Sequence, residues 1–224
     1  MPVQIFVEDR YTDTYEILAR RVRGDHQVRA SRIDPEDLTS FENLLDLVQR
    51  SARARFDCVL FIMDEEGPDS PERPAKLASF RQAFQELCGH LLSLPPNDFL
   101  RRVRVTRVVC RRCQEGWLAA DPQAVVDAFR GPKGVDWRPP VHRTDELTPR
   151  QASEAIVHIA RAVGRRIERS SLRTFDSRDV KARGKDIAAH LDPARARAFN
   201  SSLAYFLDMV DGRRSGCDHP FPDP

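Results

Sequence analysis

Acidic side chains follow two short hydrophobic segments of this chain, and their placement is suited to metal chemistry. Glu8 comes directly after residues 3–7 (VQIFV), and Asp64 and Glu66 follow residues 58–63 (CVLFIM). Short runs rich in Val, Ile and Phe are typical of central strands in a parallel sheet that is covered on both faces. The carboxyl ends of such strands meet at one edge, where α/β proteins bind their ligands. We therefore expect the three carboxylates to converge there and to bind Mg²⁺ or Mn²⁺.

The elements expected to position these carboxylates alternate between strands and helices. Helical spacing of hydrophobic residues predicts helices at 12–23 and 39–53, and a looser alternation predicts an edge strand at 26–33. With the two hydrophobic runs, this gives a β-α-β-α-β order, for which parallel strands joined by crossover helices are the economical solution. Residues 67–74 contain three prolines and a glycine, which predicts a loop beside the acidic edge.

The acidic pattern recurs further along the chain. A helix is expected at 75–92 and a strand at 103–110, after which Glu115 and Asp121 again follow a strand end. The Gly- and Pro-rich residues 131–149 predict a long irregular connection, and helices are expected at 149–167, 179–190 and 193–210. The predicted fold class is α/β, with a mostly parallel sheet flanked by helices over residues 1–130. Residues 131–211 are expected to form a helical extension packed on it, and 212–224 a flexible tail.

Composition limits the class of protein. The chain has 224 residues, of which 41% are hydrophobic and 31% charged, which predicts one globular domain with appendages. No apolar run reaches the roughly 18–20 residues needed to span a bilayer, and no leader precedes the first strand, so a cytoplasmic location is expected. Five scattered cysteines indicate reduced thiols, and the Cys110–Cys113 spacing has no second pair to complete a zinc site. A Gly-rich nucleotide loop is absent from the sequence, so ATP hydrolysis by the chain itself is not expected.

Arginine is clustered although the net charge is only +2. Two interpretations remain open for these clusters: they line a nucleic-acid path, since the guanidinium fork suits phosphate, or they solvate helix faces in an Arg-biased composition. The clusters are Arg101-Arg102-Arg104-Arg107, Arg111-Arg112, Arg161-Arg165-Arg166-Arg169 and Arg195-Arg197. Trp117 is interpreted as core packing rather than as a platform for base stacking.

Several segments resemble the Toprim domain. VQIFVEDRYTDTYEILARRV resembles its glutamate segment, and CVLFIMDEEGPDSPE resembles its aspartate segment. CQEGWLAADPQAV and GKDIAAHLDPARARAFNSSLAYFL are similar to two further segments of the Toprim-like domain-of-unknown-function family 4276. The resemblance extends from residue 3 to about residue 210 and implies a Toprim-like fold.

The resemblance also implies roles for individual residues. Asp64 and Glu66 would bind a metal that polarises a phosphate and activates water, with Glu8 as a ligand or general base. Glu115, with Asp121 near it, would complete a second metal position. Lys185 would neutralise charge that develops on the phosphate, and the favoured alternative for it is a solvent-exposed helix lysine.

Two departures from the Toprim pattern weaken or reshape such a site. Toprim proteins usually have Gly after the catalytic Glu, where this chain has Asp9, and Glu66 stands where the second aspartate is expected.

The function expected from these residues is a metal-dependent nuclease that acts on DNA or RNA. By analogy with Toprim nucleases of the overcoming-lysogenisation type, the chain is expected to work with a separate ABC-like or AAA-type ATPase, in prokaryotic antiphage defence or DNA repair. The alternative is a catalytically inactive Toprim-fold adaptor that regulates such an ATPase through protein contacts. A primase- or topoisomerase-like activity ranks last, because it needs further DNA-binding domains. No membrane partner is expected, and a homo-oligomer is left open.

Overall fold

A parallel β-sheet forms the centre of the computed structural model, which describes residues 2–24, 27–65, 71–111, 113–131 and 143–212. The strands of the described chain lie in the order β2-β1-β3-β4, and all pair in parallel. They are β1 (Val3–Val7), β2 (Val28–Arg32), β3 (Cys58–Asp64) and β4 (Arg104–Cys110). This confirms the expected α/β class with a parallel sheet, and the helix–strand order of the first half of the chain.

The two central strands explain why the sheet has a hydrophobic core on each face. Successive side chains of a strand point to opposite faces, so Leu60 and Ile62 of β3 enter one core while Phe61 and Met63 enter the other. β1 is buried along its whole length for the same reason. In contrast, β2 forms an edge of the sheet and its burial is mixed, as its polar sequence VRASR requires.

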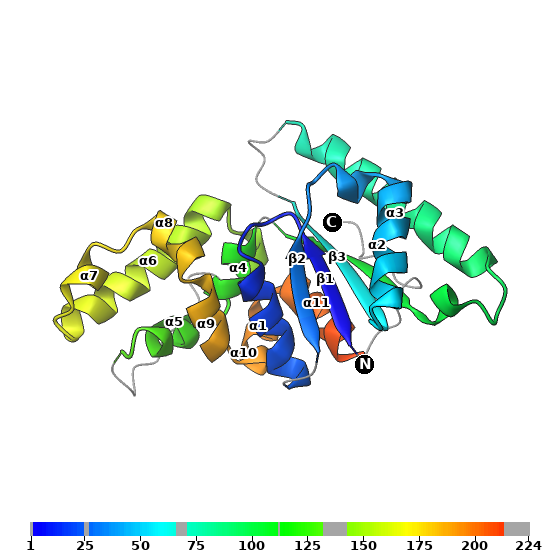
Figure 1. Cartoon of the computed structure of the whole chain (residues 1–224). Helices are drawn as coiled ribbons and strands as arrows, with labels where there is room; N and C mark the ends of the chain where they lie inside the picture. Colours follow the sequence, from blue (N-terminus) through cyan, green and yellow to red (C-terminus); the bar gives the residue numbers. More distant parts are fainter. Residues whose placement is uncertain (1, 25–26, 66–70, 112, 132–142, 213–224) are drawn as a thin grey trace.

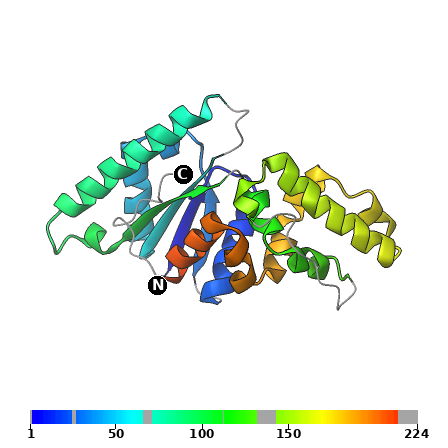
Figure 2. The ribbon, with the colours of Figure 1, turned by 180° about the vertical axis from the view of Figure 1, so that it is seen from behind.

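Helices cover both faces of the sheet (Figures 1 and 2). On one face lie α2 (Phe41–Arg53) and α3 (Arg73–Ser93), whose hydrophobic residues share a core with Val59 and Phe61. On the other face lie α1 (Thr12–Arg23) and the C-terminal helix α11 (Ser201–Asp211), which belong to the second core. The C-terminal helix is therefore part of the layer that buries the sheet.

The remaining helices form a lobe beside the sheet (Figure 1). They are α4 (Gln114–Ala119), α5 (Pro122–Ala128), α6 (Pro149–Arg166), α7 (Ser170–Arg173), α8 (Ser177–Ala182), α9 (Gly184–His190) and α10 (Pro193–Phe199). Trp117 of α4 joins this lobe to the sheet layer: its ring stacks on Phe206 with centroids 5.0 Å apart, and its indole N–H donates to Ser202 at 2.7 Å. Trp117 is fully buried, which confirms its interpretation as core packing.

The C-terminal helices are shorter than the sequence predicted. The single helix expected at 193–210 is wrong, because Asn200 adopts an extended conformation (φ −143°, ψ 111°) between α10 and α11. Its side-chain oxygen accepts a hydrogen bond from the amide of Leu203 at 2.9 Å, which caps α11. The helix expected at 179–190 is likewise divided, since Arg183 ends α8 and precedes α9.

Some expectations cannot be compared with the described residues. Residues 132–142, within the expected irregular connection, lie outside them, as do Glu66, Cys217 and residues 213–224 of the expected tail. The boundary expected near residue 130 stays a prediction. One hydrophobic cluster contains residues from both sides of it, because α4 and α5 precede it while α6 and α9 follow.

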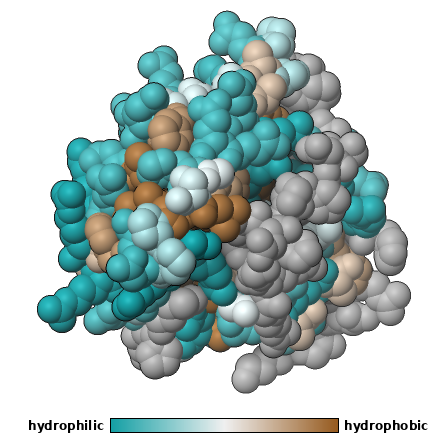
Figure 3. Space-filling model, turned by 90° about the vertical axis from the view of Figure 1, so that its right-hand side faces the viewer, coloured by the Kyte–Doolittle hydropathy of each residue, from teal (hydrophilic) through white to brown (hydrophobic). Residues whose placement is uncertain are grey.

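The surface seen from the side of α2 and α3 is mostly hydrophilic, with a hydrophobic patch near its middle (Figure 3). Large hydrophobic side chains that are exposed in the described part of the chain include Leu92 and Phe99. Within the same part, none of the helices combines the length and the hydrophobicity that crossing a membrane requires. Among the described cysteines, those at 58, 110 and 113 are free thiols.

Candidate active site

The register of the central strands brings Glu8 and Asp64 together. Val7 at the end of β1 is paired with Ile62 of β3, so Glu8 follows β1 at the level where β3 ends with Asp64. The carboxylate of Glu8 accepts a hydrogen bond from the main-chain amide of Asp64 at 2.7 Å. The convergence of these two residues at the carboxyl edge of the sheet was expected from the two hydrophobic runs alone.

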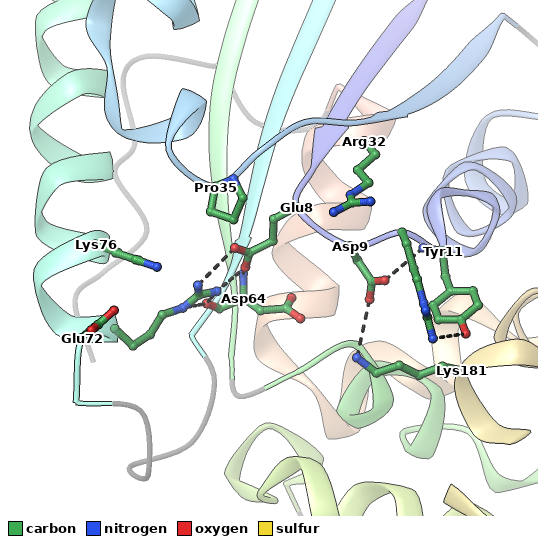
Figure 4. Close-up of a pocket in the computed structure, with 11 residues that line it drawn as sticks. Glu8, Asp9, Tyr11, Arg32, Pro35, Asp64, Glu72, Lys76 and Lys181 are labelled. Carbon is green, nitrogen blue, oxygen red and sulfur yellow. Dashed lines mark hydrogen bonds and ion pairs between the residues drawn. The ribbon is translucent and has the colours of Figure 1, made fainter. Parts of the chain in front are cut away.

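A pocket of about 490 Å³ opens at this edge (Figure 4). Carboxylates and cations line it together: Glu8, Asp9, Arg10, Tyr11, Arg32, Pro35, Asp64, Glu72, Arg73, Lys76 and Lys181. Glu72, which directly precedes α3, and Lys76 of α3 lie on one side of Glu8 and Asp64, whereas Asp9 and Lys181 lie on the other (Figure 4). The pocket thus joins elements from both halves of the chain.

Asp64 is placed in an environment that disfavours its charge. Burial raises the pKa of Asp64 well above its usual value, and the nearby carboxylates of Glu8, Asp9 and Glu115 raise it further, against a smaller opposing effect of Lys181. Its Oδ1 atom is buried without a hydrogen-bond partner. Oδ2 of Asp9 and Oε2 of Glu115 are also buried without one. Buried carboxylate oxygens without hydrogen bonds are costly, so this acidic cluster favours a proton or a cation.

Glu115 reaches the acidic cluster because α4 begins only a few residues after β4 ends. Its side chain is 5% exposed, and its carboxylate lies 3.7 Å from the Nζ atom of Lys181. The same Nζ atom lies 3.8 Å from Oδ2 of Asp9. Lys181 of α8 therefore links a carboxylate after β1 with a carboxylate after β4.

Lys181 was not among the residues expected at the site. Burial lowers the pKa of Lys181, but the carboxylates of Glu115, Asp9 and Asp64 outweigh this effect, so the net shift of its pKa is upward. Lys181 thus stays cationic at neutral pH. No local pattern distinguishes it in the sequence, since a lysine in a short charged helix resembles any solvated residue.

Asp9 is a member of the acidic cluster. From the sequence, Asp9 was expected to weaken or reshape the site, since Toprim proteins usually have Gly there. In the structure its Oδ1 atom accepts a hydrogen bond from the amide of Tyr11 at 2.9 Å, which orients Oδ2 toward Lys181. Asp9 adds a carboxylate to the site, in keeping with a reshaped site.

Arg73 is the second residue that was not expected at the site. It lies in the first turn of α3, and its side chain is only 6% exposed. Its guanidinium donates to both carboxylate oxygens of Glu8, one of them at 3.1 Å, and also to the main-chain carbonyl of Asp64. A buried, forked pair of this kind is the strongest class of charge-assisted hydrogen bond.

Two residues expected at the site lie elsewhere. Lys185 points to Asp13, with 3.9 Å between the charged atoms, and both side chains are largely exposed. Asp121 is buried in the helical lobe, where it accepts hydrogen bonds from Arg195 at 3.0 and 3.1 Å and from the amide of Asp192 at 2.7 Å. Neither lines the pocket that contains Glu8 and Asp64.

The site contains the type of ligand that a hard cation prefers, but its side chains are not arranged around a metal position. Within the described ranges, no three His, Cys, Asp or Glu side chains are grouped so that they could hold a metal ion. The oxygens that lack hydrogen bonds on Asp64, Asp9 and Glu115 are nevertheless the ligand type that Mg²⁺ and Mn²⁺ prefer. The guanidinium of Arg73 already neutralises Glu8. A cation at this site would therefore be held by Asp64 with Asp9 or Glu115, and by Glu8 once Arg73 has released it.

The raised pKa of Asp64 predicts how stability depends on pH. Because the folded protein holds this proton more tightly than the unfolded chain, the free energy of unfolding should fall as pH rises from about 4 through the raised pKa. Asp64→Asn removes this pH-dependent fall in the free energy of unfolding, because asparagine does not ionise. We expect the variant to be more stable than the wild type at pH 7, with the difference vanishing near pH 4.

Urea denaturation at several pH values, without divalent metal, measures this difference. Asp13→Asn is the matched control, since its carboxylate is 70% exposed and its removal should change little. A destabilised Asp64→Asn at pH 7 would contradict the electrostatic account of the site.

The chain matches no family model, no curated protein and no solved structure.

Proposed function

We propose that this chain is a metal-dependent nuclease that cleaves phosphodiester bonds in DNA or RNA. One observation carries the proposal: an acidic floor at the carboxyl edge of a parallel sheet faces a pocket bordered by cations. Phosphodiester cleavage needs both features, since a metal requires anionic ligands and the substrate is itself an anion.

The acidic floor supports metal binding. Asp64, Asp9 and Glu115 supply buried oxygens that lack hydrogen bonds, and like charge around Asp64 raises its pKa. A bound Mg²⁺ or Mn²⁺ would supply Lewis acidity toward a phosphoryl oxygen and a water nucleophile at neutral pH. Once released by Arg73, Glu8 would complete the ligand set or accept a proton from water.

The border of the pocket supports binding of a polyanion. Arg10, Arg32 and Lys76 line the pocket, and all three residues are exposed to solvent. Arg10 lies over the ring of Tyr11, 4.8 Å from its centroid, and donates to its hydroxyl at 2.8 Å. These cations can contact phosphates on either side of the bond that is cleaved, and such contacts position the backbone without reading its sequence.

Lys181 is the cation best placed to act during the reaction. It is half-exposed toward the pocket and is held between Asp9 and Glu115. A fixed ammonium group at this position stabilises negative charge that develops on the phosphate. The role that the resemblance gave to Lys185 therefore passes to Lys181 in this proposal.

The Toprim resemblance supports the same reaction and adds a partner. By analogy, the nuclease works as a subunit with an ABC-like or AAA-type ATPase in prokaryotic antiphage defence or DNA repair. The lack of a Gly-rich nucleotide loop in the sequence favours a separate ATPase over an ATP site in this chain.

Cleavage assays test the proposal. Plasmid, single-stranded DNA and total tRNA are incubated with Mn²⁺ or Mg²⁺ and wild type, Asp64→Ala or Glu8→Ala, alone and with any ATPase encoded next to the gene. We expect cutting that requires the metal and is lost in both variants. Asp13→Ala is the matched control, because its exposed carboxylate lies outside the pocket and its loss should preserve cutting. Cutting that survives in Asp64→Ala would overturn the proposal.

The second candidate is a catalytically inactive adaptor that regulates the ATPase through protein contacts. The buried pair of Arg73 and Glu8 favours it, because a carboxylate neutralised by arginine needs no metal. Silence in every combination, with a folded protein that still binds the ATPase, would support the adaptor.

A further inference from the structure

Arg73 occupies the cation-binding side of Glu8. Its guanidinium contacts both carboxylate oxygens of Glu8, and Glu8 Oε1 also accepts the amide of Asp64. The fork is buried, with side-chain exposures of 6% for Arg73 and 12% for Glu8. These contacts leave Glu8 little capacity for a metal.

The carboxylates next to Glu8, unlike Glu8 itself, have oxygens without hydrogen bonds. Asp64, Asp9 and Glu115 keep buried oxygens without hydrogen bonds, although Lys181 lies within 3.8 Å of two of these residues. Cationic charge is therefore unevenly distributed: Glu8 is fully paired, whereas the acidic cluster next to it is not. A divalent ion that entered the cluster would take Glu8 as a ligand only by replacing Arg73.

We propose that Arg73 is a built-in competitor of the divalent metal at Glu8, and that it holds the site in a state of low metal affinity until it is displaced. This inference rests on the proposed function, because it concerns the regulation of the same metal site. Displacement requires the first turn of α3 to release both Glu8 and the main-chain carbonyl of Asp64.

The gain in metal affinity on removing Arg73 depends on how often Arg73 releases Glu8 in the wild-type protein. A ligand that binds only the open form of a site has an apparent affinity reduced by the fraction of molecules that are open. Breaking a buried, forked ion pair is unfavourable, so this fraction is small in the wild-type protein. If it is about a tenth or less, removing the guanidinium raises the apparent metal affinity about tenfold or more.

A purely structural role for Arg73 predicts a different result. In that case the guanidinium only fastens α3 to the end of β3 through the carbonyl of Asp64. Its removal would lower stability without raising metal affinity. The affinity for Mn²⁺ thus separates the two roles.

Mn²⁺ binding, followed by titration calorimetry and by the electron paramagnetic resonance signal of free Mn²⁺, tests the proposal on the full chain without nucleic acid. We expect Arg73→Gln to bind Mn²⁺ about tenfold more tightly than the wild type. Lys76→Gln is the matched control, because it removes an exposed positive charge from the same pocket and helix. Its affinity should change by less than about threefold. The gain should disappear in the double variant Asp64→Asn/Arg73→Gln.

Other outcomes of the Mn²⁺ titrations distinguish failure of the proposed competition from failure of the proposed metal site. Equal affinities of wild type and Arg73→Gln, both lost on Asp64→Asn, would overturn the competition and leave the metal site of the proposed function intact. An equal gain in Lys76→Gln would also overturn it, because it would show a general effect of charge. Absence of Mn²⁺ binding from wild type and Arg73→Gln alike would overturn the competition and the metal-dependent function together.

Circular dichroism and the thermal midpoint establish that each variant is folded. Should Arg73→Gln fail to fold, Arg73→Lys serves in its place, because lysine keeps the charge but cannot form the fork. It is expected to bind Mn²⁺ more tightly than the wild type by a smaller factor. An unchanged affinity in Arg73→Lys would then overturn the proposal.

Discussion

Replacing Lys181 with Met should lower the rate of metal-dependent cleavage by about 10²–10³-fold, the effect typical of removing one group that stabilises transition-state charge. Its ammonium lies 3.7 Å from Glu115 and 3.8 Å from Asp9, and nothing else from α8 lines the pocket. Methionine preserves the length of the side chain and its packing while it removes the charge. The loss should therefore appear in the rate of the chemical step under single-turnover conditions with saturating metal.

Lys185→Met is the matched control for this prediction. Lys185 lies on the next helix, its side chain is 54% exposed and its ammonium faces Asp13 outside the pocket. We expect cleavage within about twofold of the wild type, as is usual for a surface substitution. The reverse pattern, with loss in Lys185→Met and retention in Lys181→Met, would show that the role implied by the resemblance is right and that the structural assignment is wrong.

The contrast between these lysines shows what sequence alone predicts for this site. Glu8 and Asp64 were found because each ends a hydrophobic run, and parallel strands carry their ends to one edge. That signal is local, because it depends only on two short hydrophobic runs and on the residue that follows each run. Lys181 and Arg73 come from helices whose position relative to the sheet depends on packing across the whole chain. Nothing in the residues around them distinguishes them from solvated cations.

The helices were likewise predicted well where the signal is local, and missed where it depends on long-range contacts. Helices α1 and α2 were predicted nearly to the residue, because their hydrophobic faces repeat at helical spacing. The break between α10 and α11 was missed, because Asn200 lies within a run that keeps a helical hydrophobic pattern. Its extended conformation is stabilised by distant contacts, such as the hydrogen bond of its side-chain amide to Thr144 at 3.2 Å.

Asp121 follows a strand end, as expected, but it lies away from the pocket and has a different role. Like Glu115, it follows β4, and the sequence therefore placed both near a metal. A Pro after Asp121 begins α5, which turns the aspartate away from the pocket and into the lobe. There its side chain is 1% exposed and forms an ion pair with Arg195. Asp121 does not line the pocket.

Asp121→Ala should reduce the free energy of unfolding by about 2–3 kcal/mol, because the main-chain amide of Asp192 and the guanidinium of Arg195 lose their buried acceptor. The cost stays below that of breaking a fully buried pair, since the Arg195 side chain is 49% exposed and can turn to water. Asp127→Ala on α5 is the matched control: its carboxylate accepts only a helical bond from Gln123 at 2.9 Å, so its loss should cost about 0.5 kcal/mol.

Urea denaturation measures this cost, and Mn²⁺ titration of the same variants decides between the two roles of Asp121. A structural carboxylate predicts reduced stability with metal affinity within about twofold of the wild type, as long as the protein remains folded. A metal ligand predicts the opposite, namely a large loss of affinity with little change in stability when metal is absent. The buried contacts with Arg195 and Asp192 favour the first result, because a carboxylate that already accepts these hydrogen bonds has no oxygen directed at the pocket.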